Sequence, residues 1–265
     1  MVHLYLRGLL RKSFVQCFCG RSSKTPAGSR VLDVGGNIGF FSLLSAANGP
    51  VTVDTFEPNP KNQLRMCESL LLNHWHSEYD SSFHGDSKKV SRVNLNPYGV
   101  GRKEGVFSFM EHVNPGQGTM VEETGVKNAT ALNVLTLDNF ARERGWFESR
   151  PDIAILKVDV EGMEYSVMEG AMELFQAKLV RNVFMEVSAR SDEEATANKP
   201  SLIMLKNAGY MLHKVGGWLG PDENLTFPQD DNLADRILQL TIAEKAKQLN
   251  LWWKLDRAID EEIPY

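Results

Sequence analysis

The chain has 265 residues, of which 42% are hydrophobic and 24% are charged, and its formal net charge is −5. This composition is typical of a folded globular protein and excludes fibrous, disordered and low-complexity chains. The acidic balance argues against a protein whose main task is to neutralise nucleic-acid phosphates.

The N-terminal segment differs from the rest of the chain in charge. Residues 1–32 contain six basic residues and no acidic residue. We interpret residues 1–29 as a basic N-terminal extension and residues 30–265 as the folded domain. An organelle transit peptide is the alternative interpretation of the extension, because such peptides are rich in Arg and Ser and poor in acids.

From residue 30 onward, strands and helices alternate, which predicts an α/β fold with a mostly parallel sheet. The expected strands cover residues 30–34, 51–56, 90–95, 106–110, 153–158, 180–187 and 210–215. The expected helices cover residues 40–47, a segment opened by Pro58 and Pro60, a segment from Tyr165 to Phe175, a short segment ended by Gly209, and residues 233–260. Residues 112–130 are rich in Gly, Asn, Thr and Glu, and we expect a binding loop or lid there.

The most informative segment is the run Asp33-Val34-Gly35-Gly36-Asn37-Ile38-Gly39, between a strand and a helix. Glycines at this point allow a sharp turn and a close approach of the backbone to a ligand. The G-x-G-x-x-G pattern of dinucleotide sites is absent, and an acid precedes the first glycine by two residues. An acid there suits a ligand with a cationic amine, such as S-adenosylmethionine. The carboxylate of that ligand can accept hydrogen bonds from backbone N–H groups of the turn.

A second acidic residue, Glu57, follows the second expected strand and lies 24 residues after Asp33. In doubly wound sheets an acid at this point accepts hydrogen bonds from ribose hydroxyls. The alternative is a glycine-rich structural turn followed by a surface glutamate. Asp33 and Glu57 each lie at the end of an expected strand, and together they favour a binding site for a nucleoside that carries an amino acid.

Five segments resemble the FkbM-type methyltransferases, which belong to the Rossmann-like, S-adenosylmethionine-dependent methyltransferases. They are DVGGNIGFFSL, FEPNP, NPYGVGRKEGVFSF, LTLDNF and ILKVDVEGMEYSVMEGA, and they span about residues 30–215 in the family's order. The resemblance implies a doubly wound sheet of seven strands, the last antiparallel, with helices on both faces. It also implies S-adenosylmethionine as cofactor. Asn37 replaces the middle glycine of the general D-x-G-x-G-x-G loop, which is usual in this family.

The resemblance also implies roles for individual residues. It assigns Asp33, Gly35, Gly36, Asn37 and Gly39 to the methionine end of the cofactor. Glu57 corresponds to the ribose-binding acid, and Tyr98 and Gly99 correspond to the region beside the adenine. Asp86 is an alternative partner for the adenine amine.

The segment Lys157-Val158-Asp159-Val160-Glu161-Gly162 ends the strongest strand, and ligands bind at such strand ends in open α/β sheets. We expect Asp159 to be the general base that deprotonates a hydroxyl acceptor, with Glu186 as its rival. His112 and His213 are further candidates. Glu161 and Glu164 are equally well explained as capping residues at a helix start. A magnesium site made of Asp159, Glu161 and Glu186 is conceivable, but no feature requires a metal.

These observations predict O-methylation of a hydroxyl on a small molecule or sugar, with no nucleic-acid partner. The alternatives are a nicotinamide-dependent oxidoreductase, an RNA 2′-O-methyltransferase and a catalytically inactive S-adenosylmethionine-binding module. We expect residues 103–130 and 216–232 to select the acceptor. Three cysteines fit neither a disulfide framework nor a four-ligand zinc site, and no apolar run reaches the ~18 residues of a membrane span. We therefore expect a cytoplasmic protein without a transmembrane segment.

Overall fold

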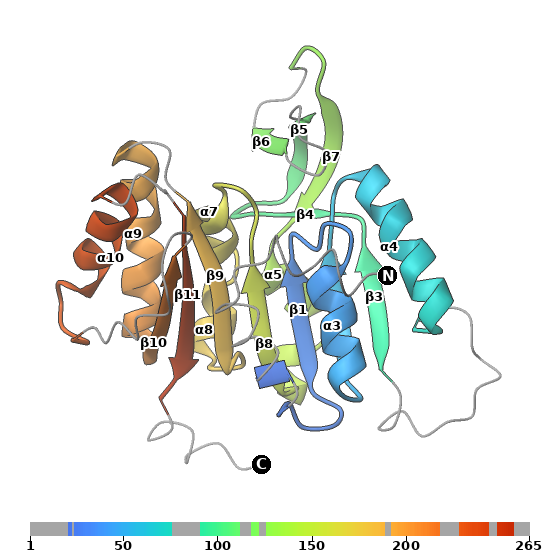
Figure 1. The fold of residues 1–265 in the computed structure, drawn as a ribbon, viewed down its shortest axis with the longest axis horizontal. Helices are drawn as coiled ribbons and strands as arrows, with labels where there is room; N and C mark the ends of the chain where they lie inside the picture. The colour runs from blue at the N-terminus through green and yellow to red at the C-terminus, as the bar shows by residue number, and fades with distance from the viewer. Residues whose placement is uncertain are drawn as a thin grey trace.

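The computed structural model describes residues 21–22, 24–75, 91–111, 118–121, 126–188, 192–217, 228–243 and 248–256. Its centre is a seven-stranded sheet with the order β10-β11-β9-β8-β1-β2-β3 (Figure 1). These strands are β1 Arg30–Val34, β2 Thr52–Phe56, β3 Arg92–Asn96, β8 Ile153–Val158, β9 Asn182–Ser188, β10 Tyr210–Gly217 and β11 Gln248–Leu255. β11 pairs antiparallel with both of its neighbours, β9 and β10, and the other pairs of neighbouring strands in this sheet are parallel. The predicted α/β class and the antiparallel last strand are confirmed.

Helices cover both faces of this sheet, as the sequence predicted (Figure 1). One face carries α3 Phe40–Asn48 and α4 Pro60–Asn73, and a separate hydrophobic core lies beneath them. The other face carries α5 Leu137–Glu143, α6 Trp146–Ser149, α7 Glu164–Glu169, α8 Met172–Gln176, α9 Asp192–Asn207 and α10 Leu233–Ala243, which share the larger core. None of the helices in the described ranges is both long and apolar enough to cross a membrane.

Local sequence explains why these elements begin where they do. All six residues of β8 are buried, which accounts for the apolar character of five of them in a central parallel strand, and Lys157 is the charged exception. Helix α4 begins at Pro60, which needs no hydrogen-bond partner for its nitrogen at that position. The side chain of Asn59 caps the helix by accepting a hydrogen bond from the Lys61 amide at 2.9 Å.

A second, four-stranded sheet stands above the carboxyl ends of the central strands (Figure 1). It consists of β4 Gly99–Val100, β7 Thr130–Leu135, β5 Gly105–Glu111 and β6 Gly118–Val121. The sequence predicted only a strand at residues 106–110, and the loop predicted for residues 112–130 is wrong at Gly118–Val121. Residues 112–117 and 122–125 lie outside the described residues. Buried Phe107, Met120 and Leu132 give this sheet a small core of its own.

The predicted C-terminal helix over residues 233–260 is wrong in its second half. Helix α10 ends at Ala243, and Gln248–Leu255 form β11, which pairs with β9 on one side and β10 on the other. Leu249, Leu251, Trp253 and Leu255 are all buried, and their spacing of two residues is that of a strand. Burial between two strands therefore outweighs the helical spacing of Leu249 and Trp253.

The single helix predicted from Tyr165 to Phe175 is two short helices, α7 and α8. They are separated at Gly170, where a Cβ atom would lie 2.1 Å from the carbonyl oxygen of Gly101. The chain needs a glycine there because the β4 segment passes against it. Helix α9 is longer than the short helix that the sequence predicted, since it spans 16 residues.

Candidate functional site: a cavity at the carboxyl ends of β1, β2 and β8

A cavity of about 480 Å³ lies at the carboxyl ends of β1, β2 and β8, beside the small second sheet. Most of the residues that the sequence assigned to a cofactor or catalytic role line it. They are Gly35, Gly36, Asn37, Glu57, Tyr98, Gly99 and Asp159. The remaining three assigned residues are not among the residues that line the cavity in the described structure. They are Asp33, Gly39 and Glu186.

The turn after β1 requires its glycines because other backbone and side-chain atoms approach it closely. A Cβ atom on Gly35 would lie 1.9 Å from the carbonyl oxygen of Asp159, and φ at Gly35 is +77°. A Cβ atom on Gly36 would lie 2.2 Å from Oγ1 of Thr55. The first two glycines of the motif therefore allow β1, β2 and β8 to converge beneath the cavity.

The amides of this turn are already bonded within the protein. Those of Gly35 and Gly36 both donate to the carbonyl of Phe56 at 3.0 Å, and that of Gly39 donates to the carbonyl of Gly36 at 2.8 Å. Asn37 has φ of 50°, a conformation that Asn tolerates better than other residues with a side chain. These hydrogen bonds within the protein hold the turn in one shape. The sequence-based expectation that its N–H groups bind the carboxylate of the cofactor stays a prediction.

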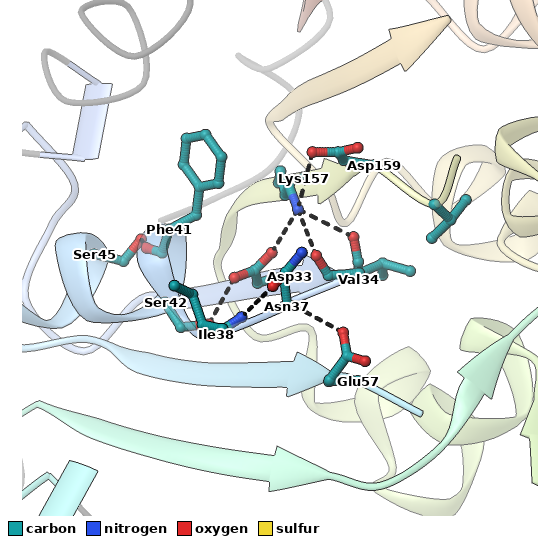
Figure 2. A network of polar contacts seen from close by, with 12 residues as sticks. Asp33, Val34, Asn37, Ile38, Phe41, Ser42, Ser45, Glu57, Lys157 and Asp159 are labelled. Atoms are coloured by element: carbon teal, nitrogen blue, oxygen red, sulfur yellow. Dashed lines mark hydrogen bonds and ion pairs between the residues drawn. The ribbon is translucent and has the colours of Figure 1, made fainter. Parts of the chain in front are cut away.

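Glu57 lies at the end of β2 with 5% of its surface exposed, and its carboxylate organises the cavity wall. Oε2 accepts a hydrogen bond from the Asn37 amide at 2.8 Å (Figure 2). Oε1 accepts from the Asn59 amide at 2.8 Å and from Nδ2 of Asn62 at 3.2 Å. Burial raises the pKa of Glu57, although these donors act in the opposite direction. A carboxylate accepts about four hydrogen bonds, so Oε2 retains capacity for a ligand hydroxyl.

Asp33 lies beneath the turn, with none of its surface exposed. Its Oδ2 atom accepts a hydrogen bond from Oγ of Ser42 at 2.6 Å, and its Oδ1 atom lies 3.2 Å from Nζ of Lys157. Lys157 lines the cavity, whereas Asp33 does not. The sequence predicted a direct contact between Asp33 and the cationic headgroup of the cofactor, and that contact stays a prediction. In this structure the partners of Asp33 are Ser42 and Lys157.

Lys157 is the buried cation at the centre of the polar network (Figure 2). Its Nζ atom donates to the carbonyl of Gly35 at 2.8 Å and to that of Val34 at 3.4 Å, and it lies 3.6 Å from Oδ2 of Asp159. Burial lowers the pKa of Lys157, but the carboxylates of Asp33, Asp159 and, more weakly, Glu186 outweigh it, so the pKa is raised overall. The side chain therefore stays an ammonium ion.

The two carboxylates that the sequence proposed as general base differ in access to the cavity. The side chain of Asp159 is 34% exposed and lines the cavity. Glu186, on β9, is 8% exposed and lies outside the described lining. His213 is packed edge-on against Trp252, with ring centroids 4.3 Å apart, and His112 lies outside the described residues. Of the candidate bases within the described residues, Asp159 is therefore the one whose side chain lines the cavity.

No group of three His, Cys, Asp or Glu side chains in the described ranges could hold a metal ion. The conceivable magnesium site of Asp159, Glu161 and Glu186 therefore lacks the required arrangement. Asp86, the alternative partner for an adenine amine, lies outside the described residues.

Glu164, at the start of α7, holds the loop that follows β8 and does not line the cavity as described. Its Oε1 atom accepts hydrogen bonds from the Gly162 amide at 3.0 Å and the Val160 amide at 3.3 Å. Its Oε2 atom is buried without a hydrogen-bond partner, and burial raises the pKa of Glu164 to about 7. The capping interpretation of Glu164 therefore fits the structure better than a catalytic one.

The apolar wall of the cavity was not predicted from the sequence. Phe40 and Phe41 come from the first turn of α3, while Phe109 and Met120 come from the small sheet. The Phe40-Phe41 pair directly after the glycine motif was a usable signal, because side chains at a helix start border the same cleft. Phe109 and Met120 had no such signal, since the pairing of β5 with β6 was not predicted.

Comparison with known proteins places this geometry in a recognised group. A family model described as the methyltransferase FkbM domain matches residues 33–212. Methyltransferase 1 of Beauveria bassiana (strain ARSEF 2860) is 24% identical over 218 residues, which cover 74% of this chain and 78% of that protein.

Two solved structures of similar fold are an FkbM methyltransferase from Methylobacillus flagellatus KT and an rRNA methylase from Streptococcus thermophilus. The first has a TM-score of 0.47 and 15% identity, covering 93% of this chain and 45% of that chain. This chain thus spans less than half the length of that protein. The second has a TM-score of 0.48 and 9% identity, covering 91% of this chain and 96% of that chain.

Proposed function

Because the chain belongs to the FkbM methyltransferase domain family, we propose that it methylates a hydroxyl group on a small molecule or sugar. Membership of this family makes S-adenosylmethionine its cofactor. The observation that carries the hydroxyl assignment is Asp159, a partly exposed carboxylate in the same cavity as the ribose-type acid Glu57. A hydroxyl acceptor must lose a proton, and Asp159 is the group at the cavity wall best suited to take it.

The residues of the cavity fit this cofactor. Its volume of about 480 Å³ is ample for a nucleoside joined to an amino acid. Oε2 of Glu57 has capacity for a ribose hydroxyl, and Tyr98, Phe109 and Met120 offer an apolar wall for a base. Glu57 and Asp159 lie at opposite ends of the polar network in Figure 2, so the proposed ribose partner and the proposed base occupy separate parts of the cavity wall.

The chemistry divides simply between cofactor and protein. The cofactor supplies a methyl group on a positively charged sulfur, which leaves as a neutral thioether. The protein positions the acceptor oxygen in line with that bond, and alignment alone supplies ~7–11 kcal/mol in the best cases. Asp159 removes the hydroxyl proton as the oxygen–carbon bond forms, which contributes ~10²–10⁴-fold.

The charges around the cavity support an uncharged or cationic acceptor. In the part of the chain that is described, Glu57, Asp159 and Glu161 line the cavity together with a single cation, Lys157. Lys157 is already paired with Asp33 and Asp159. A phosphate-bearing acceptor would meet uncompensated negative charge there, which supports the expectation that nucleic acid is not the substrate.

The test is methyl transfer from isotopically labelled S-adenosylmethionine to a panel of neutral polyols, sugars, phenols and RNA. We expect label in neutral hydroxyl compounds and none in RNA. An O-methyl ether keeps its label in alkali, whereas a methyl ester releases it as methanol, so alkaline treatment identifies the bond. With the acceptor found, Asp159→Asn should abolish most turnover, whereas Glu186→Gln should retain it. Equal turnover by Asp159→Asn and the wild type would remove Asp159 as the base.

Binding without transfer would point to the remaining alternative. If calorimetry shows uptake of S-adenosylhomocysteine while no acceptor is methylated, the inactive cofactor-binding module becomes the better explanation. The oxidoreductase alternative is not supported, since the family match is to methyltransferases. Labelled RNA in the panel would favour the RNA 2′-O-methyltransferase instead.

A further inference from the structure

We propose that Lys157 is a positioning residue that holds the cofactor turn and Asp159 in place, and that Asp33 serves as its counter-ion. This inference rests on the proposed function, because it concerns binding of the same cofactor. It assigns a role to Lys157 and changes the role of Asp33 from a ligand for the cofactor ammonium to a partner inside the protein.

The first observation is the placement of the pair. Lys157 on β8 and Asp33 on β1 are direct partners in the register of two parallel strands. Their side chains are 2% and 0% exposed, and Nζ lies 3.2 Å from Oδ1. Withdrawing two charges from water is unfavourable unless the geometry repays it, so a pair this deep needs an explanation beyond stability.

The second observation is the direction of the ammonium donors. The Lys157 ammonium donates hydrogen bonds to the Gly35 and Val34 carbonyls, and it forms an ion pair with Oδ1 of Asp33. These three partners belong to the end of β1 and the first residue of the turn. The donors are therefore used within the protein, and the cation holds the turn at the residue whose φ of +77° sets its shape.

The third observation is that the same cation reaches the catalytic side of the cavity. Nζ of Lys157 lies 3.6 Å from Oδ2 of Asp159 and 5.2 Å from the centre of the Phe41 ring. Asp159 is also tied to β1 through its amide, which donates to the Val34 carbonyl at 3.2 Å. One ammonium ion thus links the cofactor turn to the proposed base, which lies two residues after Lys157 and directly after the end of β8.

Two roles for Asp33 make different predictions about ligand binding. If Asp33 bound the cofactor ammonium directly, its loss would weaken S-adenosylhomocysteine and leave 5′-methylthioadenosine, which lacks the amino acid headgroup, unaffected. If Asp33 acts through Lys157 and the turn, its loss would weaken both ligands together. The turn also carries the Asn37 amide that bonds Glu57, so its displacement reaches the ribose end.

The experiment measures calorimetric affinities for both ligands in the wild type, Asp33→Asn, Lys157→Met and the double variant. We expect each single variant to lose about tenfold for both ligands, the effect of one charge-assisted hydrogen bond. The double variant removes the buried charge together with its partner, so its thermal stability should recover relative to the single variants. Its affinity should stay low, because the Gly35 carbonyl and Asp159 have lost their anchor.

Three results would overturn the inference. The first is a selective loss for S-adenosylhomocysteine in Asp33→Asn, which would restore the direct contact. The second is wild-type affinity in the double variant, which would make the pair purely structural. The third is a wild type that binds neither ligand, in which case the proposed function fails and this inference with it.

A milder variant keeps the test informative if the charge variants do not fold. Ser42→Ala removes the hydrogen bond to Oδ2 of Asp33 and alters no residue of the described cavity wall. We expect a smaller, equal loss of affinity for both ligands. A loss confined to S-adenosylhomocysteine would contradict the inference here as well.

Discussion

The backbone amide of Asn37 donates a hydrogen bond to Oε2 of Glu57 at 2.8 Å, so the protein itself joins the glycine turn to the proposed ribose-binding acid. The two residues follow different strands, β1 and β2, and are 20 positions apart. A carboxylate fixed in this way presents its remaining acceptor position in one direction. Preorganisation of this kind lowers the entropic cost of binding a hydroxyl.

The first prediction concerns Glu57. Glu57→Gln keeps the size of the side chain but replaces a charged acceptor, and we expect affinity for S-adenosylhomocysteine to fall about ten- to a hundredfold. Because burial raises the pKa of Glu57, wild-type affinity should also fall on acidification at a pH above the ordinary glutamate range. Calorimetry across a pH series measures both effects. In the Gln variant, affinity should not fall on acidification in this pH range. If it falls as in the wild type, the pH dependence belongs to another titrating group.

The second prediction concerns the left-handed backbone at Asn37. Asn37→Gly keeps the amide that bonds Glu57, so we expect affinity for S-adenosylhomocysteine within about threefold of wild type. Asn37→Val places a β-branched residue at φ of 50°, which costs about 1–3 kcal/mol and should weaken binding about tenfold.

Asn128 provides the matched control for that substitution. It has φ of 65° and is exposed, and it does not belong to the cavity lining in the described structure. Asn128→Val should therefore lower thermal stability without changing affinity. If Asn37→Val and Asn128→Val bind S-adenosylhomocysteine with equal affinity, the backbone conformation of Asn37 does not contribute to ligand binding.

The third prediction concerns the close contact at Gly35. Gly35→Ala would place a methyl group 1.9 Å from the Asp159 carbonyl oxygen, at a φ of +77°. Backbone atoms cannot move aside cheaply, so we expect a loss of at least about 2–3 kcal/mol in the free energy of unfolding. Gly49→Ala is the control, because no atom lies within 4 Å of the position that its Cβ would take and its φ is 168°. Urea denaturation should separate the two variants, and equal stability would contradict the contact.

The parts of this fold that the sequence predicted are those in which short-range pattern and burial agree. β1 and β8 are short apolar runs that end in acids and glycines, and their positions match the prediction. The glycine turn after β1 was recognisable as a turn because its glycines and its Asn satisfy local backbone demands at fixed spacing. The position of Glu57 at the cavity was predictable because strand ends at one edge of a parallel sheet converge on one cleft.

Other features depend on pairing between distant segments, which one sequence does not reveal. Leu249 and Trp253 fit a helix and a strand equally well, and only the open position between β9 and β10 decides for a strand. The partnership of Asp33 with Lys157 depends on the register of β1 against β8. Before that register is known, Asp33 is a plausible ligand for a cofactor, whereas the register surrounds it with protein donors.

The last prediction concerns Glu164 and the pH dependence of stability. Its pKa is raised from 4.5 to about 7 by burial, so the folded protein binds this proton more tightly than the unfolded chain. The free energy of unfolding should therefore decrease as pH rises from about 4.5 to about 7, by up to about 3 kcal/mol from this group.

Glu164→Gln isolates this contribution, because its amide oxygen can still accept from Gly162 and Val160 but does not titrate. Urea denaturation at pH 5 and pH 8 should show a smaller loss of stability in the variant than in the wild type. Titrating groups that do not interact with Glu164, Glu57 included, act equally in both proteins, so the difference between the two losses belongs to Glu164 and its repulsion from Asp159. Parallel losses would mean that Glu164 is already ionised at low pH, and that the orphaned Oε2 atom has found a partner in solution.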